Sequence, residues 1–271
     1  MPARKTEEKQ ATPPARADFV PSPEFSPPYP PLPHHFNDNH EIQILCQAPQ
    51  GAIKRALPRP LEQNSYEDLF ILQMGWSPEC EGFNVHEIQI NAPVRWKDKV
   101  GSTTLIEYID SDMGLIAGRE IWGWPKKMAD IVWTQTTTGW TVTCNKQKDQ
   151  GGILLMKAEY TISSSTPATE WPVMLPVYLV KRIPNASPTV LPLTQLVCIG
   201  GNVPPGGASE LSPTAEKTET KGTATVQFLD GPHDPLTFFS PVKVLDARMS
   251  ITKGSMLGGL GLGDVVYQWE E

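Results

Sequence analysis

Short runs of alternating β-branched, aromatic and polar residues, separated by Gly, Pro, Asn and Asp, dominate the sequence and limit the folds open to it. They begin near residue 40 and include "EIQILCQA", "NVHEIQINAPVRW", "TTLIEYID", "GILLMKAEYTI" and "PVKVLDARMSIT". A period of two places successive side chains on opposite faces of a strand, and turn residues between such runs are typical of antiparallel hairpins. The sequence therefore predicts an α+β fold that is predominantly antiparallel β, with few helices.

Only two segments are candidate helices. The segment "QGAIKRALPRPL", residues 50–61, follows Pro49 and is predicted to end near Pro58. The segment "YLVKRIP", residues 178–184, is a shorter candidate. By contrast, "MGLIAGRE" (113–120) and "DIVWTQT" (130–136) are predicted to be strands. Residues 200–222, rich in Gly, Pro, Ser and Thr, are predicted to be a long loop.

The composition divides the chain into a tail and one domain. Residues 1–33 are charged and then strongly proline-rich ("PSPEFSPPYPPLP"), which disfavours helix and sheet. We expect either an arm that uses Phe25 and Tyr29 to wrap a neighbour or a simple disordered extension. Residues 34–271 are expected to form a single domain, because β-rich folds of this length often do.

The charge and hydropathy of the chain argue against two classes of partner. The formal net charge is −7 over 271 residues and no Lys/Arg-rich run occurs, so nucleic acid is not expected. No stretch approaches the roughly 18 apolar residues that span a bilayer, and the N-terminus lacks the apolar core of a signal peptide. We expect a soluble, cytoplasmic protein with no membrane partner.

No motif indicates a metal or a cofactor, and none is predicted. The histidines near the start, His34, His35 and His40, lack a Cys or acidic partner at ligand spacing and are expected at the surface. The glycine pairs match neither of the common phosphate-binding patterns. The cysteines contain no CxxC pair and are expected to be small buried hydrophobes; they are Cys46, Cys80, Cys144 and Cys198.

Two adjacent lysines, Lys126 and Lys127, follow Pro125 in "GREIWGWPKKMAD", residues 118–130. A lysine pair is usually a solvated surface feature, but this pair is flanked by tryptophans and by apolar segments. Burial and mutual repulsion would both disfavour the ammonium form and lower the pKa of the lysine. A lysine with a lowered pKa supplies the neutral amine that attacks a carbonyl carbon.

The segment "GREIWGWPKKMADI" resembles the active-site segment of the acetoacetate decarboxylase family, which carries GRE, an aromatic residue and PKK. Most of residues 34–269 also resemble that family, through "AIKRALPRPLE", "FNVHEIQINAPV", "YLVKRIPN" and "SPVKVLDARMSI" in the same order. The family is itself the known example of a lysine activated beside another cation. The resemblance implies a closed or cone-shaped β-barrel with an internal pocket, and a homo-oligomer.

The resemblance also implies roles for individual residues. Lys126 is the Schiff-base lysine, Lys127 is its cationic neighbour, and Glu87 is the acid that faces the pocket. Arg119 and Glu120 organise the substrate site, as a buried ion pair or a hydrogen-bonded brace. Trp124 occupies the aromatic place of the motif and is expected to contact the substrate.

Two features of the family are missing. The region "HHFNDNHEIQIL" has no arginine where the decarboxylases commonly carry one, and Asn39 or His40 lies nearest to that place. The strand "LFILQMGW" lacks the family's glutamate; Ile71 lies near its place, and Gln73 is the nearest polar group. We expect Gln73 to contact the substrate. How a substrate carboxylate would be held stays open.

The expected function is that of a carbon–carbon lyase that decarboxylates a β-keto acid. Neutral Lys126 adds to the ketone, loss of water gives an iminium ion, and loss of CO2 leaves an enamine. Glu87 or an ordered water then protonates the enamine carbon, and hydrolysis frees the ketone product. No cofactor is required for these steps.

Two alternatives stay open. A lysine-imine aldolase, dehydratase or cyclase would use the same intermediates, and the missing arginine and glutamate fit a substrate with no carboxylate to lose. A non-catalytic barrel that binds a ligand is the other alternative, and an ordinary pKa for Lys126 would favour it. Six tryptophans either pack in the core or line a large pocket for a bulky, polyketide-like keto acid of secondary metabolism; they are Trp76, Trp96, Trp122, Trp124, Trp133 and Trp140.

Overall fold

The computed structural model describes residues 21–31, 34–163, 170–201, 216–258 and 263–269. Fourteen strands in these ranges form one large sheet. They are β1 (His34–Gln47), β2 (Glu62–Gln63), β3 (Leu69–Cys80), β4 (Phe83–Trp96), β5 (Lys99–Ile109), β6 (Lys126–Met128), β7 (Asp130–Gln135), β8 (Gly139–Asn145), β9 (Leu154–Ile162), β10 (Val177–Ile183), β11 (Leu193–Ile199), β12 (Glu216–Phe228), β15 (Lys243–Gly258) and β16 (Asp264–Trp269). A separate hairpin pairs β13 (Asp230–Gly231) with β14 (Asp234–Pro235).

The main path through the sheet is β16-β11-β10-β5-β4-β3-β1-β15-β12-β9-β8-β7, with β2 beside β4 and β6 beside β5. Among the described strands, only β10 and β6 pair parallel to a neighbour, and that neighbour is β5 in both cases. The predicted strand-rich, mainly antiparallel fold with few helices is confirmed.

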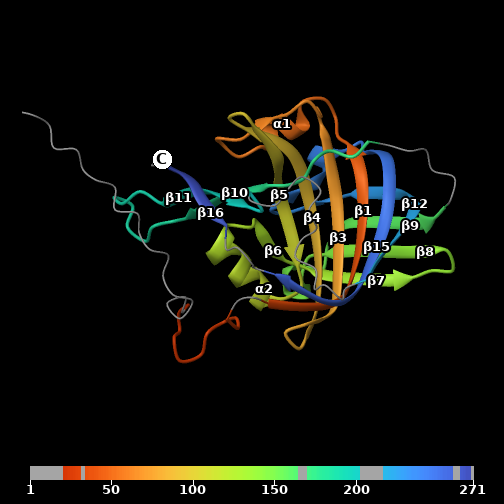
Figure 1. Ribbon diagram of the computed structural model, residues 1–271, viewed down its shortest axis with the longest axis horizontal. Coiled ribbons are helices and arrows are strands. Elements are labelled where there is room, and N and C mark those ends of the chain that lie inside the picture. The colour runs from red at the N-terminus through yellow and green to blue at the C-terminus, as the bar shows by residue number, and fades with distance from the viewer. Residues whose placement is uncertain (1–20, 32–33, 164–169, 202–215, 259–262, 270–271) are drawn as a thin grey trace, which may run out of the picture.

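The predicted closed or cone-shaped barrel is not confirmed, because the described strands leave the sheet open, with β16 at one end and β7 at the other. Figure 1 shows the long strands β1, β3, β4 and β15 crossing the middle of the molecule. Strands β10, β11 and β16 lie to one side of them, and β7, β8 and β9 to the other.

The helical segments are short. They are α1 (Ala52–Ala56), α2 (Asp112–Ala117), a π-helical turn η2 (Gly118–Trp122), and two 3-10 turns, η3 (Lys148–Gln150) and η4 (Leu236–Phe239). The first predicted helix is therefore present in α1, but it ends at Ala56, ahead of Pro58. The second, over 178–184, is wrong. That segment lies in β10, which pairs with β11 along its whole length.

The predicted strand over residues 113–120 is also wrong, because this segment forms α2 and the start of η2. The Ser111 hydroxyl accepts a hydrogen bond from the Gly114 N–H, and Asp112 lies in the first turn. A serine cap with an acidic residue behind it is a helix-start signal that outweighs the β propensity of a short apolar run. The strand predicted over 130–136 is confirmed as β7.

The central strands have an apolar face and a polar face. In β1, β3 and β4, even-numbered residues such as Ile42, Leu72 and Ile88 are buried in the main core. Successive strand residues project to opposite sides. The opposite face carries the polar side chains of these strands at odd-numbered positions, namely Glu41, Gln43, Gln73, Glu87 and Gln89. The candidate site lies on this polar face.

Parts of the predicted tail and loop lie outside the described residues, namely 1–20, 32–33 and 202–215. Within the tail, Tyr29 is buried against its own chain, whereas Phe25 is 92% exposed. Residues 216–222 of the predicted loop instead begin strand β12. The division into a tail and a single domain stays a prediction.

None of the described helices has the length and apolar character needed to cross a membrane.

Candidate active site

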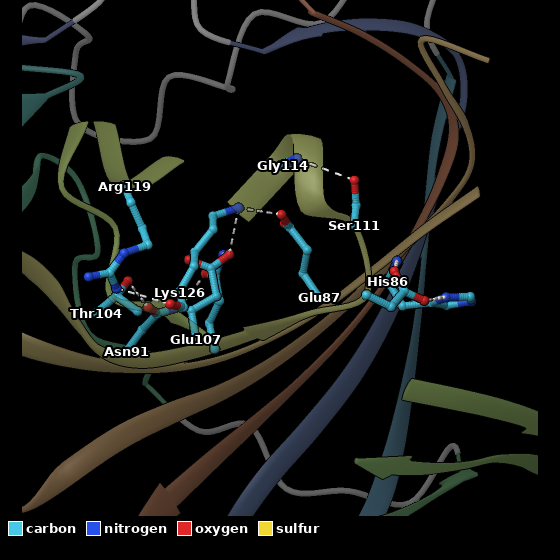
Figure 2. A network of polar contacts seen from close by, with 11 residues as sticks. His86, Glu87, Asn91, Thr104, Glu107, Ser111, Gly114, Arg119 and Lys126 are labelled. Carbon is cyan, nitrogen blue, oxygen red and sulfur yellow. Dashed lines mark hydrogen bonds and ion pairs between the residues drawn. The ribbon is translucent and has the colours of Figure 1, made fainter. Parts of the chain in front are cut away.

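Lys126 lies between two carboxylates on the polar face of the sheet (Figure 2). Its Nζ is 2.6 Å from Glu87 Oε1 and 3.1 Å from Glu107 Oε1. Glu87 belongs to β4 and Glu107 to β5, and β6 starts at Lys126 directly opposite Glu107. The structure thus brings the predicted Lys126 and Glu87 together. It also adds Glu107, which the sequence analysis did not single out.

A pocket of about 250 Å³ opens beside the Lys126 amine. Its charged lining residues are Lys126, Glu87 and Glu107, and no arginine is among the described residues that line it. Most of its walls are apolar and include Phe36, Val85, Met113, Trp122, Trp124 and Ile199. Apolar walls with a few convergent polar groups are typical of a small-molecule site.

The backbone before Lys126 is held by a sharp turn. The N–H groups of Gly123 and Trp124 both donate to the Gly118 carbonyl, each at 3.0 Å. Gly123 closes the π-helical turn at φ 86°, a left-handed conformation that glycine adopts without strain. On the other side, Arg119 Nη1 donates to the Lys126 carbonyl at 3.0 Å. These contacts fix where the lysine side chain starts.

The pKa of Lys126 is raised, so the predicted lowering is not found. Burial alone would lower it, but the charges of Glu107 and Glu87 outweigh burial. Burial raises the pKa of Glu107 to about 7, even with the Lys126 ammonium beside it. Lys126 is therefore held as an ammonium, and it must give a proton to a neighbour before it can attack a carbonyl carbon.

Lys127 points away from the pocket, as expected for the next residue in a strand. Its ammonium pairs with the buried carboxylate of Asp234. Lys146 Nζ lies 2.8 Å from the other oxygen of Asp234, and Tyr108 donates to this carboxylate at 2.7 Å. Asp234 therefore offsets part of the positive charge of Lys127, and the charges that shift the pKa of Lys126 are those of Glu107 and Glu87. Its catalytic role stays a prediction.

Of the four predicted substrate-binding residues, only Trp124 lines the pocket. Arg119 and Glu120 are both exposed, so the predicted buried ion pair is wrong. Arg119 is instead a brace on the Lys126 backbone. Glu120 accepts a hydrogen bond from the Tyr29 hydroxyl at 3.3 Å, which connects it to the N-terminal segment rather than to the pocket.

Gln73 is connected to the site through other side chains and does not line the pocket. Asn91 Nδ2 lies 3.2 Å from Gln73 Oε1 and 3.1 Å from Gln89 Oε1, and donates to both. Gln89 Nε2 donates in turn to Glu107 Oε1 at 3.0 Å. Thr104 fixes Asn91 by donating to its Oδ1 at 2.6 Å, as Figure 2 shows. This network orients Glu107, and Gln73 extends it by donating from Nε2 to Glu41 Oε2 at 3.0 Å.

Only two of the six tryptophans, Trp122 and Trp124, line the pocket. Trp76, Trp133 and Trp140 pack against one another, and Trp96 packs against Tyr178. Trp96, Trp133 and Trp140 are partly buried against core clusters, as the core interpretation predicts, whereas Trp76 is partly buried against the other aromatic rings.

Two of the N-terminal histidines are more enclosed than expected. His34 is 6% exposed and lines the pocket, so the surface placement predicted for it is wrong. Its Nε2 lies 3.0 Å from the Pro30 carbonyl oxygen. His40 packs against the ring of Trp76 with centroids 4.7 Å apart.

Fold and site together define a mainly antiparallel β protein with a small-molecule pocket built around a buried lysine and two carboxylates. The family model described as acetoacetate decarboxylase matches residues 19–268, and this chain belongs to that family.

Relatives from Mesorhizobium japonicum show the extent of the sequence similarity. The chain is 33% identical to acetoacetate decarboxylase 3 over 106 residues, which cover 39% of this chain and 41% of that protein. It is 28% identical to acetoacetate decarboxylase 2 over 178 residues, which cover 64% and 66%. The first match thus spans less than half of the relative.

Solved structures show the same fold. Acetoacetate decarboxylase from Legionella pneumophila superposes with a TM-score of 0.75 at 22% identity, covering 94% of this chain and 95% of that one. The enduracididine biosynthesis enzyme MppR, complexed with the condensation product of pyruvate and imidazole 4-carboxaldehyde, gives a TM-score of 0.63 at 15% identity, covering 92% and 98%. At these identities the likeness supports the fold alone.

Proposed function

We propose that this chain is a carbon–carbon lyase that forms an imine between Lys126 and a β-keto acid and releases CO2. The observation that carries the proposal is the position of the Lys126 amine, at the edge of an apolar-walled pocket and within 2.6 and 3.1 Å of two carboxylates. Membership of the acetoacetate decarboxylase family supports the same chemistry.

The proposed reaction starts with a proton transfer from the Lys126 ammonium to one of its two carboxylates. The free amine then adds to the ketone, and loss of water leaves an iminium ion. When the bond to the carboxylate carbon breaks, its electron pair moves toward the iminium nitrogen, giving CO2 and a neutral enamine. A carboxyl group or water then protonates the enamine carbon, which gives an iminium ion again. Hydrolysis of this iminium ion releases the ketone.

The pocket favours a compact substrate. Its volume of about 250 Å³ is below the roughly 300–1,000 Å³ of sites for drug-sized ligands. The proposed substrate is therefore a small β-keto acid, and the bulky polyketide-like acid of secondary metabolism has no support in the described pocket. Assembly into a homo-oligomer and a cytoplasmic location stay predictions.

A second candidate is an aldolase, dehydratase or cyclase that uses the same imine. The charges of the pocket favour it, because a substrate carboxylate would meet Glu87 and Glu107 and no arginine among the described lining residues. A neutral carbonyl substrate avoids this repulsion. The MppR complex shows that a similar fold can hold a condensation product.

Borohydride trapping tests the proposal. The protein is incubated with a panel of β-keto acids and ketones, reduced and digested, and the modified peptide is located by mass. We expect the adduct on Lys126 and none in Lys126→Ala. Lys157→Ala is the matched control, because Lys157 is a half-buried lysine outside the pocket that also pairs with a glutamate, with its Nζ 2.6 Å from Glu159 Oε1. The Lys157→Ala variant should form the Lys126 adduct to the same extent as the wild type.

Release of CO2 separates the two candidates. Trapping with CO2 release supports the lyase, whereas trapping without it supports the aldolase class. If no lysine is trapped, or if Lys126→Ala is trapped like the wild type, the imine proposal is wrong and a ligand-binding protein becomes the better interpretation.

A further inference from the structure

Glu107 has one carboxyl oxygen with no assigned partner. Its Oε1 faces Lys126 Nζ at 3.1 Å and accepts from Gln89 Nε2 at 3.0 Å. Its Oε2 is buried and has no hydrogen-bond partner among the described residues. Glu107 is also fully buried and lines the pocket. An unpaired oxygen on a buried carboxylate is costly, whereas a neutral carboxylic acid at the same place costs far less.

We infer that Glu107 is the acid that delivers a proton to the enamine carbon, while Glu87 holds the ammonium of the resting lysine. This inference rests on the proposed imine at Lys126. In the step itself, the O–H bond of Glu107 breaks and a C–H bond forms with the electron pair of the enamine double bond. The nitrogen becomes an iminium ion again, and Glu107 becomes a carboxylate that takes its next proton from water.

The position of Glu107 suits this step. The carbon that receives the proton lies two bonds from Lys126 Nζ, so its donor must adjoin that nitrogen. The network through Gln89 and Asn91 holds Oε1, which leaves Oε2 as the oxygen available to the substrate. An acid fixed in this way needs no rearrangement at the moment of transfer.

The two carboxyl groups have different surroundings, which assigns them different roles. Glu87 makes the closer contact with the ammonium, at 2.6 Å, and 29% of its side chain is exposed. Glu107 is 0% exposed and lies 0.5 Å farther from the same atom, at 3.1 Å. Burial raises the pKa of Glu107 to about 7, so this group can both lose and regain a proton near neutral pH.

Few other titratable groups face Glu107. From β6 it meets the Lys126 ammonium, and from β4 it meets Glu87. The Cys80 thiol and the His34 ring line the same pocket from β3 and β1. Burial raises the pKa of the Cys80 thiol to about 12, which leaves it protonated near neutral pH. When the rate of proton transfer is measured against pH, the ionisation of a carboxyl group is therefore assigned to a residue by comparing variants.

Hydrogen exchange on a ketone isolates the proton transfer from any loss of CO2. Methyl ketones from acetone to benzylacetone are incubated with the protein in D2O, and deuterium incorporation at the α-carbon is followed by NMR. The same carboxyl group removes and returns the α-proton, so the assay reports on either imine reaction. Borohydride trapping is run in parallel to measure the imine itself.

For Glu107→Gln we expect trapping at Lys126 to persist while α-proton exchange falls by about 100-fold or more. Wild-type exchange should rise with pH as the carboxyl group ionises, and this rise should be absent in Glu107→Gln. Glu107→Asp should restore part of the exchange. Glu159→Gln, a surface glutamate paired with Lys157, is the control and should match the wild type in both assays.

Each other outcome has a definite meaning. Exchange within a few-fold of the wild type in a trapped Glu107→Gln protein overturns the inference, and so does loss of trapping in a folded variant, since Glu107 would then act in imine formation. Absence of trapping in the wild type overturns the imine proposal instead. If Glu107→Gln does not fold, Glu107→Asp decides. If α-proton exchange in Glu107→Asp rises at the same pH as in the wild type, the assignment to Glu107 is overturned.

Discussion

The side chain of Lys126 packs directly on the backbone of Gly118. A Cβ added at Gly118 would lie 2.5 Å from Lys126 Cε and 2.8 Å from its Cδ, closer than real Cβ contacts. The backbone of Gly118 is ordinary right-handed helix, with φ −59° and ψ −44°, so the requirement here is space rather than conformation. The glycine of the GRE segment makes room for the lysine.

We expect Gly118→Ala to displace the Lys126 amine from Glu87 and Glu107. The methyl group meets the flexible end of a lysine, which can move, and alanine is favoured over glycine in a helical turn by about 1 kcal/mol. Stability should therefore change little while trapping falls steeply. Thermal unfolding and borohydride trapping measure the two effects. Wild-type trapping in the alanine variant would show that this contact does not position the amine.

The variant Lys127→Met tests whether Lys127 contributes to imine formation or to the stability of the fold. In Lys127→Met, Asp234 keeps Lys146 and Tyr108 but loses one charged partner. We expect the free energy of unfolding to fall by about 1–3 kcal/mol, with trapping at Lys126 within a few-fold of the wild type. Urea unfolding and trapping are the measurements. Loss of trapping in a folded variant would instead support the predicted role as cationic neighbour.

The reactivity of Lys126 should depend on pH in a way that reports its carboxylate partners. Because those charges raise its pKa, the labelling of wild-type Lys126 by acetic anhydride should still increase above the ordinary lysine value of about 10.4. Glu87→Gln removes one of the charges and should move this increase to lower pH. Mass spectrometry of the Lys126 peptide follows the labelling. An increase that occurs below the ordinary value in the wild type would contradict the described geometry.

Asp234 should make the fold sensitive to acid. Burial opposes ionisation of this carboxyl, but hydrogen bonds from Lys127, Lys146 and Tyr108 outweigh burial and lower its pKa. A carboxyl with a lowered pKa in the folded state adds stability above the unfolded-state pKa of about 3.9, and that stability is lost as the pH falls through the folded-state value.

The corresponding variant is Asp234→Asn. At neutral pH it should be less stable than the wild type by about 3 kcal/mol or more, because two lysines lose their buried partner. The difference should shrink as the pH is lowered toward about 3, since the wild type then loses the same interaction. Urea unfolding across this range gives the comparison. A difference in stability that does not change with pH would show that Asp234 is not the source of the acid sensitivity.

Local sequence patterns predicted most of the strands, and the resemblance of one segment to the acetoacetate decarboxylase family singled out Lys126 as the candidate nucleophile. Period-two alternation is a property of neighbouring residues, so "NVHEIQINAPVRW" could be assigned to a strand without knowledge of its partners. The resemblance of the PKK segment and of this strand to the family pointed to Lys126 and Glu87, whose Nζ and Oε1 atoms lie 2.6 Å apart in the structure. The lone glutamate in the apolar run "TTLIEYI" was a signal for Glu107, since a charge on a buried strand needs a partner.

The surroundings of the two lysines, by contrast, depend on contacts between distant parts of the chain. Strand alternation separates Lys126 from Lys127, but the partner of Lys127, Asp234, lies 107 positions further along the chain. The direction of the Lys126 pKa shift depended in the same way on two carboxylates brought in from β4 and β5. Electrostatic effects depend on distance in space and on burial, and long-range strand pairing sets both. The choice of Lys126 as the candidate nucleophile thus came from the sequence, through its resemblance to the family, whereas the protonation state of Lys126 is a property of the assembled sheet.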